Sequence, residues 1–248
     1  ALKLARDGDN LAVRAAQALR EATGVRKGLR IALEKHIPVG GGLGGGSADA
    51  AAVLNGLNVM WNTGVGATRL GEIGSKLGCD VPALLDGGVV CMEGLGERVT
   101  PLKGKGNQLR AGWWVVLAYP GFSVSTRDIY TRHSLSLTVD DEKYKRMVRS
   151  LRVADLLLAA ENLHNDLQDT VFTKYPLIEI MVERLREAGA IGAMVSGSGA
   201  SIFGLARDQQ HAARVAGEFQ ERLGMPVWVR VAKTLPDGVM AAHGPLEA

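Results

Sequence analysis

Six of the seven residues at positions 40–46 are glycine, and Ser47 follows them directly. Glycine inside an ordinary element costs up to about 1 kcal/mol relative to alanine, so this density indicates a backbone path that other residues could not follow. Large apolar residues then recur at helical spacing over positions 47–61. A glycine-rich loop leading into a helix presents unpaired N–H groups at the positive end of the helix dipole, which attracts phosphate. The sequence therefore predicts a phosphate-binding loop and a helix that begins near Ser47.

Two familiar phosphate motifs fit this loop poorly. Gly41 and Gly46 have the Walker spacing, but position 47 is serine where that motif requires lysine. Gly40, Gly42 and Gly45 satisfy the dinucleotide pattern, as almost any run of glycines does, yet no acidic residue closes a second strand about 20 residues further on. A turn without a ligand would need only one or two glycines.

Asp80, Asn10 and Lys35 are polar residues at predicted element ends, and their types leave two interpretations open. Asp80 directly precedes Val81 and Pro82, so it either caps a short helix or contributes chemistry. Asn10 suits the N-cap of a helix that stops at Gly24, and Lys35 closes a predicted strand as either a solvated or a ligand-binding lysine.

The composition narrows the class of protein. The chain has 248 residues, of which 46% are hydrophobic and 22% charged, enough for two medium domains. Its net charge of +3 is small and the charges are interleaved, which argues against a nucleic-acid partner and suits a phosphorylated small molecule. The histidines are dispersed, so no zinc site is expected. Without an apolar run near the roughly 18 residues of a membrane span, the two cysteines indicate a cytoplasmic protein with no membrane partner.

The first half of the chain predicts helices and strands around the glycine loop. A helix over 11–24 precedes a strand over 28–35, and a second helix over 67–78 follows the loop helix. Three strand-like segments come next, at 87–94, 97–102 and 111–121. The polar connection at 103–110 separates two domains, which we place at 1–107 and 108–248.

The second half predicts an α+β domain. A short helix follows the Ser/Thr run at 123–126, and further helices are expected over 140–151, 154–163, 176–189 and 208–223. Two strands flank a tight turn at 196–199, and a last strand covers 226–233. Helices on one face of an antiparallel sheet would complete this domain.

The stretch PVGGGLGGGSADAA resembles the phosphate-binding motif of the GHMP small-molecule kinases, Pro-x-x-x-Gly-Leu-Gly-Ser-Ser-Ala. LGCDVPALLDGG, PGFSVSTRDIY, ENLHNDL and AMVSGSGASIFGL resemble further segments of the family, in the family's order. The resemblance implies an α+β fold of two domains: a ribosomal S5 domain 2-like N-terminal domain and a ferredoxin-like C-terminal domain.

The two runs of three glycines on either side of Leu43 resemble one branch of the family in particular. That branch transfers the γ-phosphoryl group of ATP, with Mg²⁺, to the 2-hydroxyl of a cytidine diphosphate derivative of methylerythritol in non-mevalonate isoprenoid synthesis. Two alternatives stay open: a GHMP kinase for another alcohol, such as homoserine, mevalonate or a sugar, and a nucleotide-binding module without catalysis. The sequence gives no indication of the oligomeric state.

The resemblance also implies roles for individual residues. Asp80 would receive the proton of the substrate hydroxyl or orient that hydroxyl, and Ser47 would contact phosphate or Mg²⁺. Tyr130 would stack on the substrate's cytosine, and Thr126 would shape the same cleft. The turn at 196–199 would pack beside the phosphate loop. The residues expected to bind ATP are Asn10, Leu11, Lys35, Pro38, Gly40, Gly41, Gly42, Leu43, Gly44, Gly45, Gly46 and Ser47.

The chain departs from the family pattern at its start. The family has an N-terminal strand with an Ala-Lys-x-Asn-Leu motif, whose lysine partners the catalytic aspartate, followed by an Asp-Gly-Tyr-His segment. Neither motif occurs here, and Ala48 replaces the second serine of the loop. We expect the native protein to carry an additional N-terminal segment with these motifs and with strands that complete the first domain's sheet.

Overall fold

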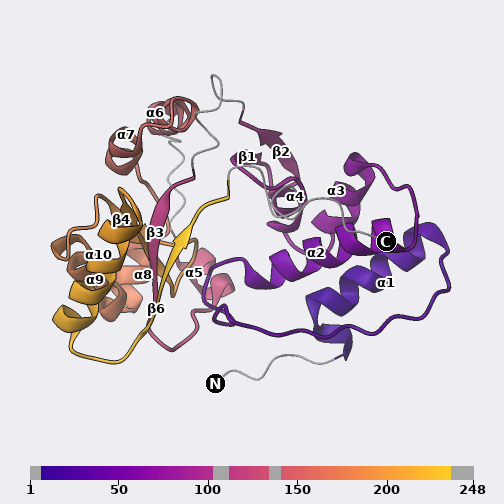
Figure 1. Ribbon diagram of the computed structural model, residues 1–248, viewed down its shortest axis with the longest axis horizontal. Helices are drawn as coiled ribbons and strands as arrows, with labels where there is room; N and C mark the ends of the chain where they lie inside the picture. The colour runs from indigo at the N-terminus through magenta and orange to yellow at the C-terminus, as the bar shows by residue number, and fades with distance from the viewer. Residues whose placement is uncertain (1–6, 103–111, 134–140, 236–248) are drawn as a thin grey trace. The chain divides into compact units, whose positions relative to one another are not determined.

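The computed structural model describes residues 7–102, 112–133 and 141–235, which form two compact units (Figure 1). The first unit contains the described residues up to Val39 together with Gly44–Leu102. The second contains Gly40–Leu43 and the described residues between 112 and 234. The domain boundary expected between residues 107 and 108 lies outside the described residues.

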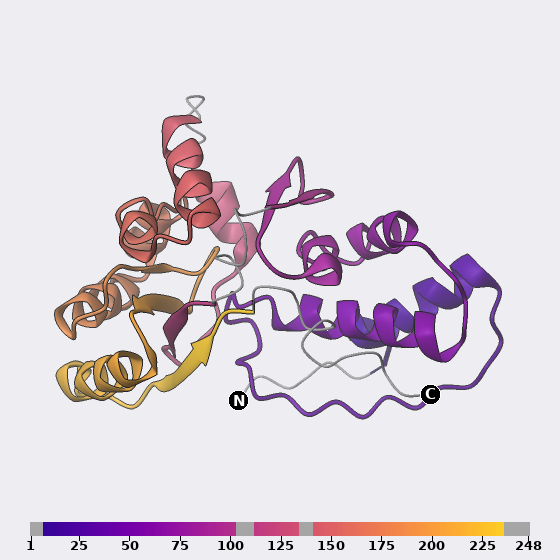
Figure 2. The ribbon, with the colours of Figure 1, turned by 45° about the horizontal axis from the view of Figure 1, so that its top comes forward.

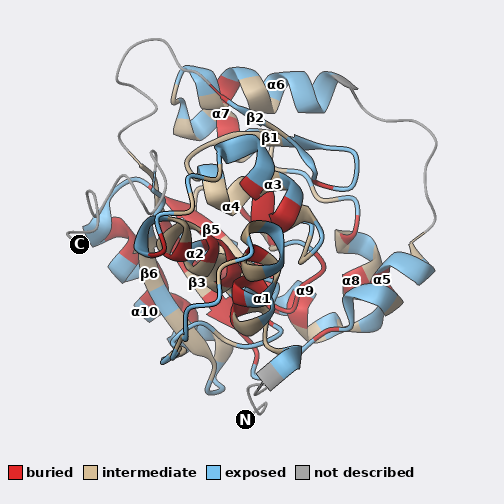
Figure 3. Cartoon of the chain, turned by 90° about the vertical axis from the view of Figure 1, so that its right-hand side faces the viewer, coloured by how far each residue is buried: buried red, intermediate tan, exposed pale blue. Residues whose placement is uncertain are grey.

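The first unit is built on two neighbouring helices, α1 (Leu11–Thr23) and α2 (Gly45–Met60), which lie side by side in Figure 1. The Asn10 side chain caps α1 by accepting the Ala12 N–H at 2.9 Å, and Gly24 ends the helix in the left-handed region. Both helix ends were predicted. Apolar side chains pack across the α1–α2 contact, where Leu19 and Leu54 are fully buried. Figure 3 colours the buried parts of both helices red.

The remaining elements of the first unit follow α2. They are a short 3₁₀ turn before α1 (Asp7–Asp9), α3 (Ala67–Ser75), α4 (Val81–Asp86) and the antiparallel hairpin of β1 (Val90–Glu93) and β2 (Arg98–Pro101). The two strands and the helices occur where they were predicted. The boundaries differ slightly, because α2 begins at Gly45 instead of Ser47 and α3 ends three residues before Gly78.

The strand predicted over residues 28–35 does not form in the described part of the chain. The alternation that suggested it is nevertheless visible in the burial: Leu29, Ile31 and Leu33 are half-buried, while the residues between them are exposed. Leu29 and Ile31 pack against the α1–α2 core. The pattern therefore fixes which side chains face the core, but a strand also needs a hydrogen-bonded neighbour, and no described strand pairs with this segment.

The second unit is organised around a four-stranded antiparallel sheet in the order β4-β5-β3-β6. Its strands are β3 (Trp114–Tyr119), β4 (Ala193–Val195), β5 (Ile202–Ala206) and β6 (Trp228–Lys233), all at predicted positions. The helices α9 (Pro176–Glu187) and α10 (Gln209–Leu223) pack together on one face, as the orange and gold helices of Figure 2 show. Val116, Ile202, Leu185 and Phe219 are buried between helices and sheet, which makes this unit α+β.

Four further helices complete the second unit: α5 (Thr126–Arg132), α6 (Asp141–Arg152), α7 (Leu156–Glu161) and α8 (Gln168–Lys174). The first three were predicted, but α8 was missed. Its sequence, QDTVFTK, contains two threonines and a valine, which are weak helix formers, and buries only Val171 completely. Within the described residues, no helix is both long enough and apolar enough to cross a membrane.

Candidate active site

The second half of the glycine loop forms the start of α2. Gly44 occupies the N-cap position with φ of 65°, and the first bond of the helix runs from the Ala48 N–H to the Gly44 carbonyl at 2.9 Å. The N–H groups of Gly45, Gly46 and Ser47 precede that bond, so they can bind an anion at the positive end of the helix. Ser47 is the third residue of α2, and Gly44 takes the N-cap position.

Asp80 lies close to the start of α2, inside the same unit. A Cβ placed on Gly44 would be 3.9 Å from Asp80 Oδ2, and one placed on Gly78 would be 3.5 Å from Ser47 Oγ. Asp80 occupies the N-cap position of α4, yet its side chain makes no capping hydrogen bond and the residue is exposed. The cap interpretation therefore does not account for this carboxylate, which is available beside the first amides of α2.

The β1–β2 hairpin supports the peptide that carries Asp80. A Cβ on Gly96, whose φ is 101°, would be 2.5 Å from the carbonyl oxygen of Cys79. In the same turn, Glu97 Oε2 accepts the Leu95 N–H at 2.6 Å, and the amides of Glu97 and Leu95 hold the pKa of the Glu97 carboxyl below its usual range. The turn is thus well defined, and it fixes the main chain one residue before the catalytic candidate.

Lys35 is held at the first turns of α2. Its Nζ lies 2.6 Å from Asp49 Oδ2 and donates to the Gly45 carbonyl at 3.2 Å. The side chains of Lys35 and Asp49 are 15% and 21% exposed, so the interpretation of Lys35 as a solvated lysine is wrong. Asp49 was not predicted as a site residue, although an acidic residue two positions after Ser47 lies within reach of a cation near the loop.

Three other predicted nucleotide-binding residues lie in the first unit. The Asn10 side chain serves as the N-cap of α1. Leu11 packs against the loop helix, because its Cδ1 would be 3.2 Å from a Cβ on Gly46. Pro38 is half-buried in the segment that leads into the loop. Leu11 therefore borders the phosphate loop directly.

The first half of the glycine loop, Gly40–Leu43, packs within the second unit. The Ser201 N–H donates to the Gly41 carbonyl at 2.8 Å, and Ser196 Oγ donates to the Gly42 carbonyl at 2.9 Å. A Cβ on Gly42 would be only 2.4 Å from the Gly199 carbonyl oxygen, and φ there is 79°. The turn at 196–199 is thus in direct contact with the loop, and only glycine fits at position 42.

Helix α5 carries the two residues predicted to bind the acceptor. Thr126 Oγ1 and Ser198 Oγ are hydrogen-bonded at 2.9 Å, which joins the start of α5 to the same turn. Tyr130 is 61% exposed, so its ring is accessible. Ile129 is the residue of α5 that enters the core.

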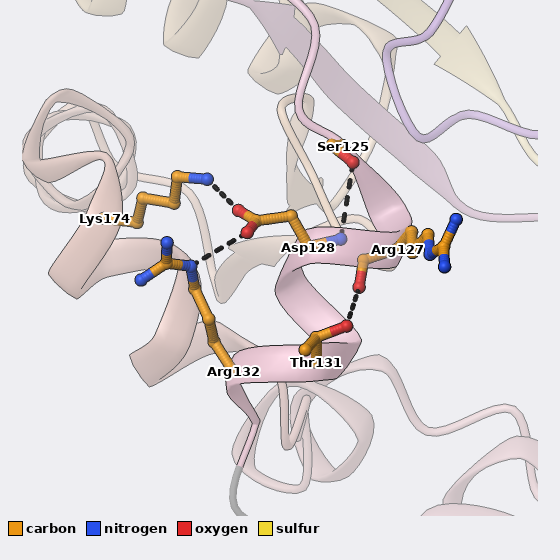
Figure 4. A network of polar contacts seen from close by, with 6 residues as sticks. All are labelled: Ser125, Arg127, Asp128, Thr131, Arg132 and Lys174. Atoms are coloured by element: carbon orange, nitrogen blue, oxygen red, sulfur yellow. Dashed lines mark hydrogen bonds and ion pairs between the residues drawn. The ribbon is translucent and has the colours of Figure 1, made fainter.

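A polar network anchors α5 to α8 (Figure 4). Asp128 pairs with Arg132 of its own helix, Oδ1 to Nε at 2.9 Å, and its other oxygen pairs with Lys174 at the end of α8. Ser125 Oγ caps α5 by accepting the Asp128 N–H at 3.3 Å. Arg127 points away from the network in Figure 4. The network fixes the helix on which Thr126 and Tyr130 stand.

Comparison with known proteins agrees with this arrangement. The family model described as "GHMP kinases N terminal domain" matches residues 10–88, and the model described as "GHMP kinases C terminal" matches residues 147–224. The chain belongs to the GHMP kinase family.

Two relatives at 38% and 40% identity carry the same name. The 4-diphosphocytidyl-2-C-methyl-D-erythritol kinase of Gloeobacter violaceus is 38% identical over 238 residues, which cover 94% of this chain and 77% of the relative. The enzyme of the same name from Alkaliphilus metalliredigens is 40% identical over 197 residues, covering 79% of this chain and 66% of the relative. The chain therefore spans about two thirds to three quarters of the length of these relatives.

Solved structures show the same fold. A crystal structure of 4-(cytidine 5'-diphospho)-2C-methyl-D-erythritol kinase matches with a TM-score of 0.74 and 33% identity, over 94% of this chain and 81% of that one. The homoserine kinase of Cytophaga hutchinsonii matches with a TM-score of 0.79 over 95% of this chain and 80% of that one. At 21% identity, the second match shows the fold alone.

Proposed function

We propose that this protein is an ATP-dependent kinase that phosphorylates the 2-hydroxyl of 4-diphosphocytidyl-2-C-methyl-D-erythritol, a step of non-mevalonate isoprenoid precursor biosynthesis. The observation that carries the proposal is the exposed Asp80 carboxylate beside the free amides that begin α2. The names of relatives at 38% and 40% identity support the choice of acceptor.

The chemistry of phosphoryl transfer suits these groups. Such a transfer depends on positioning and on stabilising charge more than on covalent chemistry. The first N–H groups of α2 would bind phosphate oxygens of ATP, and Ser47 would add a hydroxyl. Asp80 would accept the proton of the acceptor hydroxyl or orient that hydroxyl for in-line attack. The exposed ring of Tyr130 would stack on the cytosine, with Thr126 on the same helix.

Mg²⁺ fits the proposed site as a phosphate-bound ion. The described residues contain no cluster of three His, Cys, Asp or Glu side chains that could hold a metal by themselves. Mg²⁺ commonly keeps several waters and binds through one or two protein oxygens together with substrate phosphates. Ser47 Oγ supplies a protein oxygen at the first turn of α2, so it would contact the ion. The ion would neutralise charge on the β- and γ-phosphate oxygens.

The setting that we propose for this activity is the cytoplasm. Cys79 and Cys91 are both free thiols in the structure, which agrees with a reducing compartment.

An acceptor panel tests the function. ADP release is measured with ATP, Mg²⁺ and one acceptor at a time: 4-diphosphocytidyl-2-C-methyl-D-erythritol, homoserine, mevalonate and a sugar. We expect ADP release with the first acceptor and little with the others. Faster turnover of another acceptor would reassign the substrate within the family. Tight ATP binding without turnover of any acceptor would instead indicate a nucleotide-binding module.

A further inference from the structure

Asn165, just before α8, and Gln168, its first residue, hold the strand that leads into the turn at 196–199. Asn165 Nδ2 donates to the carbonyl oxygens of Val195 and Gly197, at 3.1 and 2.8 Å. Gln168 Oε1 accepts the Val195 N–H at 3.2 Å. Both polar main-chain groups of Val195 are therefore bound by side chains from one short segment.

The same turn sets the position of the glycine loop. Its Ser196 hydroxyl binds the Gly42 carbonyl, and the Gly199 carbonyl lies so close to Gly42 that no side chain fits there. Below the turn, Val171 of α8 and Ile178 of α9 would be 3.6 and 3.8 Å from a Cβ on Gly199. The turn is thus a layer between the loop and these helices, and a shift of the turn must move Gly42.

We propose that Asn165 is a positioning residue for the phosphate-binding loop and acts through the turn at 196–199. Asn165 makes none of the loop contacts described above; it fixes the two carbonyl groups on either side of Ser196, whose hydroxyl binds Gly42. The inference rests on the proposed function, in which this loop binds the phosphates of ATP.

The chemistry of the contacts explains why asparagine stands at this position. Two carbonyl oxygens require two N–H donors, while the Leu167 N–H, 3.0 Å from Asn165 Oδ1, requires an acceptor. A primary amide supplies both kinds of group from one planar head. Aspartate has the same shape and keeps the acceptor, but it would place a carboxylate oxygen against two carbonyl oxygens.

The functional test compares Asn165→Asp and Asn165→Ala with a matched control, Asn162→Ala. Asn162 is also half-buried and donates to a main-chain carbonyl, that of Leu158 at 2.6 Å, but it has no bond to the turn. We expect both Asn165 variants to weaken ATP binding about tenfold, the effect of losing one to two net hydrogen bonds. AMP affinity and the KM of the acceptor should stay near wild type, because neither depends on the β- and γ-phosphates. The control should change none of these values.

A double-mutant cycle tests whether the effect passes through the turn. If it does, Asn165→Ala combined with Ser196→Ala should weaken ATP binding by less than the product of the two separate factors. Multiplicative factors would overturn the proposed route. A uniform loss of ATP, AMP and acceptor binding, or equal effects in Asn162→Ala, would indicate general destabilisation and would also overturn it.

Amide hydrogen exchange tests the same inference without a nucleotide. Peptides covering residues 38–46 and 195–201 should exchange faster in Asn165→Asp than in wild type, and unchanged exchange of the loop peptide would overturn the proposal. The two proposals can fail separately. Absence of phosphorylation by the wild type with every acceptor contradicts the proposed function, whereas ATP affinity and loop exchange report on Asn165.

Discussion

At the scale of single residues, the side-chain contacts separate the interpretations that residue types leave open. Asp80 and Asn10 both precede helices, and both suit a cap. Asn10 makes the capping bond to Ala12, whereas Asp80 makes none and lies near Gly44. The Asp80 carboxylate is exposed, caps no helix and lies near the first amides of α2, so it has no structural role in the described part of the first unit. Asp80 is therefore the residue whose replacement should separate catalysis from folding.

Replacing Asp80 by asparagine should abolish most turnover and keep nucleotide binding. The amide retains the shape of the side chain but cannot accept the hydroxyl proton, and general-base assistance contributes about 10²- to 10⁴-fold. Steady-state kinetics and ATP titration of Asp80→Asn provide the measurement. A kcat close to that of the wild type would remove Asp80 from the mechanism.

Replacing Gly42 by alanine should destabilise the protein more than the same replacement at a glycine that has a positive φ but open space around it. The methyl group meets the Gly199 and Ser196 carbonyl oxygens at 2.4 and 2.8 Å, in addition to the cost of a positive φ. We expect a loss of about 1–3 kcal/mol in stability and a large drop in ATP affinity. Gly224→Ala is the control, because φ there is 65° and the added atom meets nothing within 4 Å. Equal losses in unfolding free energy for the two variants would show that the close approach is unimportant.

At the scale of elements, short pieces of structure fix the functional groups. The β1–β2 turn touches the carbonyl before Asp80, and the α5–α8 ion pairs hold the helix of Thr126 and Tyr130. Neither the β1–β2 turn nor α8 carries a residue that was expected to bind a ligand. Changes in these supports should therefore alter kcat or KM without touching a ligand.

Gly96→Ala tests the support below Asp80. An added methyl would be 2.5 Å from the Cys79 carbonyl oxygen, so the Cys79 peptide must shift and Asp80 with it. We expect lower kcat and a stability loss of about 1–3 kcal/mol. Gly64→Ala is matched to it, with φ of 65° and open space around the added atom. If kcat falls as much in Gly64→Ala, the hairpin does not position Asp80.

The elements also show how far the sequence determines the fold. Helices with clear stops, such as α1 between Asn10 and Gly24, were predicted almost to the residue. The segment at 28–35 was wrongly predicted as a strand. The alternation of apolar and polar residues indicates which side chains face the core, whereas a strand also needs a hydrogen-bonded neighbour from a distant part of the sequence. Helix α8 was missed because it contains weak helix formers and buries only Val171 completely. The roles of Asn165, Asp49 and Gly96 were not predicted because each depends on a contact with a residue distant in sequence, such as Val195, which is 30 residues from Asn165.

At the scale of the whole molecule, the two units do not correspond to two continuous stretches of sequence. Gly40–Leu43 belongs to the second unit, although residues on both sides of it belong to the first. The phosphate loop is therefore divided at the bond between Leu43 and Gly44. Its upstream part is fixed by a turn, and its downstream part is the start of α2.

Nucleotide binding should raise the stability of the protein in a Mg²⁺-dependent way. A ligand at 100 times its Kd adds about 2.7 kcal/mol when it binds only the folded state. We expect ATP with Mg²⁺ to raise Tm, and a chelator to remove most of the shift, because phosphate charges then lack their counter-ion. Thermal unfolding followed by tryptophan fluorescence measures this. An identical shift with AMP would contradict phosphate recognition by the loop.

The divided loop has a consequence for synthesis of the chain on the ribosome. Gly42 and its partner Ser196 are 154 residues apart, so the loop leaves the ribosome well before the turn that fixes it. At about 5–20 residues per second, the delay is roughly 8–30 s. Helices α1 and α2 can pair during that time, but the upstream glycines stay without their partners until most of the second unit has been made. The glycine loop is thus completed only after the turn at 196–199 has been made.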